Sequence, residues 1–159
     1  LSGPLVTSPI VAFGKGEAPA IKDAADLAGV RVVVVAGGLA SSLLSENGIS
    51  FKTVPEIGLG FQAVSEGTAD YFVETELNGR YALQQRTPVV GLRIFHLFSA
   101  DGARLEAHFA VAAAPGDPHG VLDQIERGLA EVRESGEYST IYGAWLARQV
   151  TASEATRGN

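Results

Sequence analysis

The sequence contains no cysteine, which excludes disulfide bonds, thiolate nucleophiles and metal sites built on thiolates. Its three histidines, His96, His108 and His119, lie far apart and lack the short spacing of metal-binding pairs. No apolar run approaches the length of a membrane-spanning helix. Basic residues number 12 against 18 acidic ones and are scattered singly, which argues against a nucleic-acid partner. We therefore expect no metal, no cofactor and no nucleic acid.

The chain does contain enough apolar material for a core. Hydrophobic residues make up 46% of its 159 positions, which suits one domain or part of a two-lobed protein. The clearest apolar run, residues 30–35, is rich in valine, is apolar on both faces and is bounded by glycine. A central strand of a parallel sheet has this pattern. Val32, Val34 and Phe72 are therefore predicted core residues.

Strand-like and helix-like patterns alternate along the chain, which predicts an α/β fold with mostly parallel pairing. Strands are predicted at residues 5–13, 30–35, 49–54, 70–73, 92–98 and 107–113. Helices are predicted at residues 40–46, 59–66 and 76–85, and two more follow near the C-terminus. Asp70, at the start of its strand, is interpreted as a residue that orients the strand rather than one that touches a ligand.

The most informative pattern lies near the end of the chain. Asp117 is a predicted N-cap, with Pro118 in the first turn of an amphipathic helix that ends near Gly136. A second, short helix carries large residues along one side: Tyr138, Ile141, Tyr142 and Trp145. Two amphipathic helices that pack on any core would give the same pattern.

Gly136, Tyr138, Ile141 and Trp145 also form a Gly-x-Tyr-x-x-Ile-x-x-x-Trp pattern. This pattern resembles the C-terminal signature of the family 3 extracellular solute-binding proteins. The resemblance continues through the chain, and its strength lies in the order of several weak motifs: Ser2-x-Pro4, Asp26-Leu27-x-Gly29 before the valine strand, and the Gly-x-x-Asp of residues 67–70.

The resemblance implies the type II periplasmic-binding-protein fold, in which a three-layer α/β lobe surrounds a central, mostly parallel sheet. It assigns residues 1–13 to the end of lobe one and the first hinge strand, and residues 14–106 to lobe two. Residues 107–150 would form the returning hinge strand and C-terminal helices that pack on lobe one, and residues 151–159 a disordered tail. The family's usual chain has a further half-lobe before the Ser-x-Pro. Without it an apolar face would be uncovered, so a homodimer or an exchanged element is expected rather than a monomer.

The expected ligand site lies where strands end, because helix N-termini with unpaired N–H groups meet there and favour an anion. In the family, Thr or Ser hydroxyls follow the central strand; here the matching positions are Gly37, Gly38 and Leu39, with Ser41 one turn further on. Thr75 stands where the family has an acidic residue that grips a ligand ammonium. These five residues are the predicted ligand-binding set. A tight strand-to-helix turn is the alternative interpretation of the two glycines.

The resemblance further implies a periplasmic or extracellular protein, free or membrane-anchored. It would bind a small polar or anionic, amino-acid-like solute and pass it to an ABC-type membrane importer. A ligand-sensing input domain of a membrane-bound signalling protein is the alternative. Cyclohexadienyl dehydratases share the fold and need a carboxylic acid in the cleft, for which Glu74 and Glu76 are the candidates. Neither has a visible partner in the sequence, so no enzyme activity is expected. His96 is interpreted as a half-buried strand residue.

Overall fold

The computed structural model describes residues 1–85 and 89–154. The chain divides into two compact units. The first, here called the sheet unit, is Ser8–Ala107, and the second, the helical unit, consists of Leu1–Thr7 and the chain from His108 onward. The lobe boundaries expected at residues 14 and 107 differ from these divisions at residues 8 and 108. The difference at the N-terminal side arises because most of the first strand belongs to the sheet unit.

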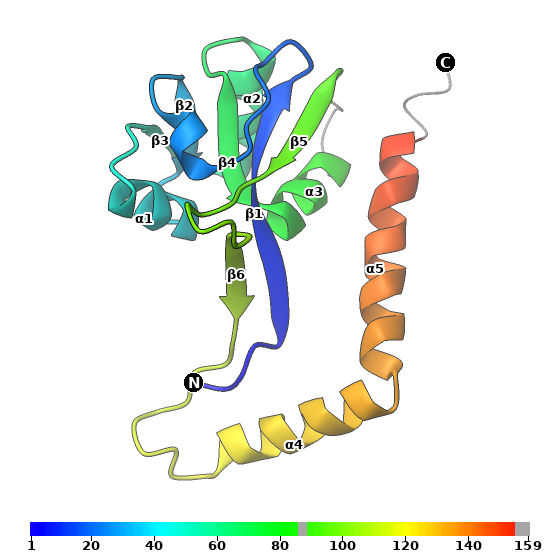
Figure 1. Ribbon diagram of the computed structural model, residues 1–159. Helices are drawn as coiled ribbons and strands as arrows, with labels where there is room; N and C mark the ends of the chain where they lie inside the picture. Colours follow the sequence, from blue (N-terminus) through cyan, green and yellow to red (C-terminus); the bar gives the residue numbers. More distant parts are fainter. Residues whose placement is uncertain (86–88, 155–159) are drawn as a thin grey trace. The chain divides into compact units, whose positions relative to one another are not determined.

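The central sheet has the strand order β3-β2-β4-β1-β5 (Figure 1). Its strands are β1 (Val6–Lys15), β2 (Val32–Val35), β3 (Lys52–Val54), β4 (Tyr71–Thr75) and β5 (Leu92–His96), and β6 (Glu106–Phe109) also pairs with β1. β2 pairs in parallel with β3 and β4, whereas β1 is antiparallel to both β4 and β5. β2, β3, β4 and β5 therefore run in one direction, which confirms the mostly parallel α/β sheet, and β1 is the reversed strand.

Helices cover both faces of this sheet (Figure 1). Alternate strand residues point to opposite faces, so each strand feeds two core clusters. One cluster joins Val32 and Val34 to Leu44 of α1 (Leu39–Glu46). The other joins Phe72 to Phe61 of α2 (Ile57–Ser65), and α3 (Glu76–Gln84) packs on the same side. The exposed fractions of Val32, Val34 and Phe72 are 3%, 0% and 0%, which confirms the predicted core and the three layers.

Two helical glycines allow α2 and α3 to approach the aromatic core closely. A Cβ atom on Gly60 would lie 2.4 Å from Cδ2 of Phe72, and one on Gly79 would lie 2.2 Å from Cζ of Phe13. Both distances are shorter than any van der Waals contact, so no larger residue fits at either position without movement. The N-terminus of α3 lies directly at the end of the sheet, because α3 begins at Glu76 and β4 ends at Thr75.

Asp70 organises the opposite end of the sheet, where β2 and β4 begin. Its carboxylate accepts hydrogen bonds from the backbone N–H of Arg31 at 2.8 Å, from Nε at 3.1 Å and from Nη2 at 2.5 Å. The hydrogen bond from the Arg31 side chain is the main cause that lowers the pKa of Asp70 below its ordinary value. Asp70 therefore holds two parallel strands in register, which agrees with its interpretation from the sequence.

The helical unit contains α4 (Val121–Glu134) and α5 (Glu137–Glu154). The prediction of Asp117 as the N-cap of α4 is wrong, because Gly120 occupies that position in the left-handed region, with φ 61°. The Asp117 carboxylate nevertheless caps the helix from outside. It accepts hydrogen bonds from the N–H groups of Val121 and Leu122, each at 2.9 Å. The chemistry of the cap is as expected, but a turn separates Asp117 from the helix.

The second C-terminal helix is longer than the short helix predicted from the sequence. α5 has 18 residues and continues to Glu154, so residues 151–154 are helical and not a disordered tail. The remaining predicted tail, residues 155–159, lies outside the described residues. The four residues directly after Trp145 are Leu146, Ala147, Arg148 and Gln149, which are all good helix formers.

Tyr138 attaches the C-terminal helices to the N-terminal segment of the helical unit. Its hydroxyl donates to the carbonyl of Leu5 at 2.8 Å, its ring lies under the guanidinium of Arg133 at 5.3 Å, and it stacks on Tyr142 at 6.0 Å. Arg133 in turn donates from Nη2 to the carbonyl of Pro4 at 2.6 Å. No residue of α4 is buried in the described structure, and the homodimer stays a prediction.

Candidate functional site

The candidate site is built on the turn between β2 and α1, at the carboxyl ends of parallel strands. Val34 of β2 is paired with Val73 of β4, so the residues after Val35 lie at the same edge as Thr75. The turn is closed by a hydrogen bond from the N–H of Gly38 to the carbonyl of Val35 at 3.1 Å. Gly37 has φ +70°, a conformation that side-chain-bearing residues rarely adopt.

The N-terminus of α1 has no side-chain cap, because its N-cap residue is Gly38. The carbonyl of Gly38 accepts hydrogen bonds from the N–H of Ser41 at 3.0 Å and from its Oγ at 2.6 Å. In the described part of the chain, the N–H groups of Leu39 and Ala40 have no partner. The donors available to an anion are therefore backbone N–H groups, while the hydroxyl proton of Ser41 is already used.

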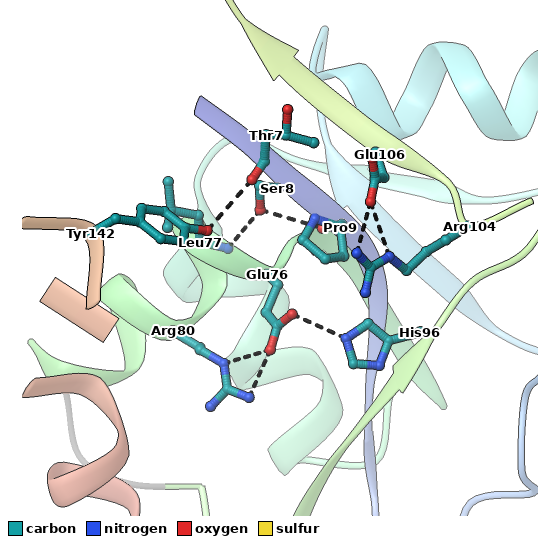
Figure 2. Close-up of polar contacts among 10 residues, drawn as sticks. All are labelled: Thr7, Ser8, Pro9, Glu76, Leu77, Arg80, His96, Arg104, Glu106 and Tyr142. Carbon is teal, nitrogen blue, oxygen red and sulfur yellow. Dashed lines mark hydrogen bonds and ion pairs between the residues drawn. The ribbon is translucent and has the colours of Figure 1, made fainter. Parts of the chain in front are cut away.

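Thr75, by contrast, caps the helix that follows it. Its side chain is 4% exposed, and Oγ1 accepts a hydrogen bond from the N–H of Asn78 at 3.4 Å. Oγ of Ser8 accepts from the N–H of Leu77 at 3.0 Å (Figure 2). Two hydroxyls thus cap the first turn of α3, whereas no side-chain hydrogen bond caps the N-terminus of α1. The same edge of the sheet therefore carries one capped and one open helix N-terminus.

A polar cluster that the sequence did not predict lies beside Thr75. Nε and Nη2 of Arg80 each approach Oε1 of Glu76 at 2.7 Å, and Nε2 of His96 lies 3.1 Å from Oε2 (Figure 2). The exposed side-chain fractions are 18% for Glu76, 28% for Arg80 and 41% for His96. Both carboxylate oxygens of Glu76 therefore have partners, and His96 is half-buried, as its place in the sequence suggested.

The electrostatics of this cluster keep Glu76 ionised. Burial raises the pKa of the Glu76 carboxyl, but the hydrogen bonds and charges of Arg80 and His96 outweigh it, and the net pKa is lowered. A general acid that works near neutral pH needs a raised pKa. Glu76 is therefore a poor candidate for the acid of a dehydratase-like reaction.

The other carboxylates at this edge also have partners. Oε1 of Glu74 accepts hydrogen bonds from the N–H of Thr75 at 2.8 Å and from the amide of Asn78 at 3.4 Å. Oε1 of Glu106 accepts hydrogen bonds from Nε of Arg104 at 3.0 Å and from Nη2 of Arg104 at 2.8 Å (Figure 2).

Among residues 1–85 and 89–154 there is no group of three or more His, Asp or Glu side chains that could hold a metal ion. Over the same residues, no helix combines the length and apolarity needed to span a bilayer.

Acidification below about pH 5 is expected to lower the free energy of unfolding, and Glu76→Gln should make that decrease smaller. The pKa of Glu76 is lower in the folded protein than in the unfolded chain, so the unfolded chain binds the proton more readily. The stabilising contribution is complete above the unfolded pKa and is lost as the pH falls through the folded pKa. Urea titrations at several pH values measure the difference between the two proteins.

The control for this prediction is Glu46→Gln. Glu46 is exposed, and it has no side-chain partner within the described residues. Its replacement should leave the pH dependence of unfolding unchanged. If both variants reduced the loss of unfolding free energy at low pH by the same amount, the cluster around Glu76 would not be the cause of that loss.

The structure brings the five predicted ligand-binding residues to one edge of the sheet, because β2 and β4 are parallel neighbours. Gly37, Gly38 and Ser41 form the open turn, Leu39 begins α1 with its side chain 52% exposed, and Thr75 ends β4. Sequence reasoning missed Ser8, Arg80 and the partner of His96. Glu76 and Arg80 are four residues apart on a predicted helix, a spacing that indicates an ion pair.

Comparison with solved structures identifies the fold. A histidine kinase sensor domain with similarity to periplasmic binding proteins matches with a TM-score of 0.73 and 23% identity over 91% of this chain and 61% of its own. The substrate-binding protein of an amino acid ABC transporter matches with a TM-score of 0.69 and 21% identity over 91% of this chain and 62% of its own. The ligand-binding core of GluR0 from Nostoc punctiforme, solved with L-glutamate, matches with a TM-score of 0.69 and 25% identity over 91% of this chain and 63% of its own.

The chain therefore has the type II periplasmic-binding-protein fold, as the motifs in its sequence predicted. It spans 61 to 63% of the length of these three structures. No protein-family model matches the chain, and no curated protein matches it significantly.

Proposed function

We propose that this chain is part of an extracytoplasmic solute-binding protein that binds a small polar or anionic, amino-acid-like solute for ABC-type uptake. Its solved neighbours include the substrate-binding protein of an amino acid ABC transporter and a ligand-binding core with bound L-glutamate. Both have the fold described above. A periplasmic or extracellular location and a membrane importer as partner belong to the same proposal.

The observation that carries this proposal is the open N-terminus of α1 after a central strand. Unpaired N–H groups at a helix N-terminus, together with the helix dipole, favour an anionic group by about 0.3–1 kcal/mol at exposed sites. The N–H groups of Leu39 and Ala40 would hold the anion, and the turn at Gly37 and Gly38 leaves no side chain in its way. In such sheets, ligands bind outside the carboxyl ends of strands.

Within the proposal, Thr75 faces the anion from the end of β4. Its Oγ1 accepts a hydrogen bond from the N–H of Asn78, and its own proton donates to no group in the described structure. Ser41 would act differently, because its hydroxyl donates to Gly38 and so fixes the turn.

Native mass spectrometry followed by denaturing release tests this proposal. The purified protein is expected to release a small polar or anionic molecule that is bound in a one-to-one ratio. Thermal melts with the twenty amino acids and common small organic acids provide the second measurement, because a ligand that binds only the folded state raises the midpoint. A protein that retains no solute and responds to none of these compounds would contradict solute binding.

A sensor role is the second candidate function. A histidine kinase sensor domain has a TM-score of 0.73, against 0.69 for the transporter component. The physical site would be the same, but closure would change the output of a signalling module instead of delivering solute. The flanking coding sequence separates the two functions, because a membrane helix after this domain indicates sensing.

A further inference from the structure

The C-terminal end of α1 is an exposed turn that contains an Asn-Gly pair. Asn47 is the C-cap residue, and Gly48 follows it with φ +67°, in the left-handed region. The N–H of Gly48 donates to the carbonyl of Ser45 at 3.0 Å. The N–H of Ile49 donates to the carbonyl of Leu44 at 2.9 Å. These two hydrogen bonds form a Schellman motif, and the side chains of Asn47 and Gly48 positions face solvent.

An asparagine that precedes a glycine can react with its own backbone. The glycine nitrogen attacks Cγ of the asparagine side chain and forms a five-membered imide. The side-chain nitrogen leaves as ammonia and takes up the proton that the glycine nitrogen loses. Water then opens the imide and gives aspartate or isoaspartate. Water is the only reactant that is consumed, and this chemistry makes asparagine a thermolabile residue.

The turn at Asn47 leaves room for this reaction. Gly48 has no side chain to shield its nitrogen, and a Cβ atom placed there would meet nothing within 4 Å. Two hydrogen bonds must break first: the one from Gly48 to Ser45, and one from Nδ2 of Asn47 to the carbonyl of Leu43 at 2.8 Å. Both lie in the last turn of a helix of 8 residues, and helix ends open at low cost in free energy.

The second Asn-Gly pair of the chain has the opposite setting. Asn78 and Gly79 lie within α3, whose first turn is capped by hydroxyls. Nδ2 of Asn78 donates to Oε1 of Glu74 at 3.4 Å. Gly79 is buried, and a Cβ atom on it would lie 2.2 Å from Cζ of Phe13. Rotation of the chain at this pair would therefore disturb both the helix and the aromatic core.

We propose that Asn47 is a site of spontaneous deamidation in the folded protein, whereas the fold protects Asn78. This inference does not depend on the proposed solute-binding function. The product carboxylate cannot donate to the carbonyl of Leu43, and it places a negative charge at the C-terminus of α1, where the helix dipole is also negative. Isoaspartate also inserts one carbon atom into the backbone before Ile49, which is 6% exposed and belongs to the core. Deamidation therefore loosens the end of α1.

Incubation of the intact chain in water labelled with heavy oxygen, followed by trypsin and mass spectrometry, tests the inference. Trypsin cleaves after lysine and arginine, so peptides 32–52 and 53–80 each contain one Asn-Gly pair. Peptide 32–52 should take up the label at least about tenfold faster, because local opening is easier at a helix end than inside a capped, packed helix. The rate should rise with pH, since the attacking nitrogen must lose its proton.

The same incubation in urea is the control for the role of the fold. Both asparagines precede glycine, so the two peptides should take up the label at similar rates in the unfolded chain. Equal rates in the folded protein would overturn the inference. It would also be overturned if peptide 32–52 took up label in urea but none in the folded protein.

Variants identify the reacting residue and its effect on stability. Asn47→Gln should remove the label from peptide 32–52, because a glutamine would have to form a larger ring, and Asn78→Gln should leave that label unchanged. Asn47→Asp reproduces one product and should lower the thermal midpoint by about 1–4 °C. Persistent label in peptide 32–52 of Asn47→Gln would refute the assignment, and an unchanged midpoint in Asn47→Asp would refute the effect on α1.

Discussion

Val34→Asp is expected to prevent folding of the sheet unit. Val34 is 0% exposed and lies in the central strand β2, between β3 and β4, in the cluster that includes Tyr71 and Leu44. An aspartate there would place a charge among buried apolar side chains. The cost should exceed about 4 kcal/mol, which is comparable to the whole stability of many domains.

Circular dichroism and thermal denaturation measure this effect, and Val90→Asp is the matched control. Val90 is 84% exposed, so the same substitution there introduces the charge into solvent. The control should keep a melting curve close to that of the wild type. A cooperative melt for Val34→Asp at the wild-type temperature would show that the core assignment is incorrect.

Gly38→Asp is expected to abolish solute binding while the protein stays folded. Gly38 is the N-cap of α1 with φ −76° and ψ 163°, an extended conformation that aspartate adopts readily. An aspartate carboxylate at an N-cap accepts hydrogen bonds from the first-turn N–H groups and stabilises the helix by roughly a few tenths of a kcal/mol relative to glycine. The same carboxylate would occupy the place proposed for the solute anion and repel it.

Binding should weaken about a hundredfold or more, because the solute loses its charge-assisted hydrogen bonds and meets a like charge. Calorimetry with the solute identified by mass spectrometry provides the measurement, and a thermal melt confirms the fold. The added Cβ would lie 3.2 Å from the carbonyl oxygen of Val35, a tight contact that a small shift relieves. Full affinity in this variant would exclude the turn as the anion site.

Gly38→Asn separates charge from steric effects in this experiment. Asparagine has nearly the same shape as aspartate and caps a helix about as well, but it carries no charge. If repulsion of the anion matters, the asparagine variant should retain clearly more affinity than the aspartate variant. Equal losses in both would indicate that the side chain merely fills the turn.

Local patterns in the sequence were enough to predict most of the fold. The valine run is apolar on both faces, and only a strand covered by helices on both sides can bury it, which is what β2 does. The order of the remaining strands and helices followed from the same alternation. Boundaries were less accurate: the strand predicted at residues 107–113 ends at Phe109 in β6, because only part of that segment pairs with β1. Pairing is a property of two segments, and one segment does not determine where it stops.

Some features of the candidate site could likewise be predicted from the sequence, and others could not. The sequence by itself determined that a Gly-Gly turn follows a central strand and that Thr75 ends another, because both depend on neighbours in the chain. Only the tertiary structure decided which polar groups remain free. Ser41 turns its hydroxyl to Gly38, and Ser8 reaches the start of α3 across 69 positions.

Glu76 and His96 show the reason most clearly. They lie 20 positions apart and meet only because β4 and β5 flank the same strand, β1. That pairing leaves one imidazole nitrogen bound and the other open. The periodicity of hydrophobic residues in a sequence indicates which face of a helix or strand is apolar, because all residues on a buried face contact the core. It does not predict a hydrogen bond between a helix and a strand that are separated in the chain, such as the one between Glu76 and His96.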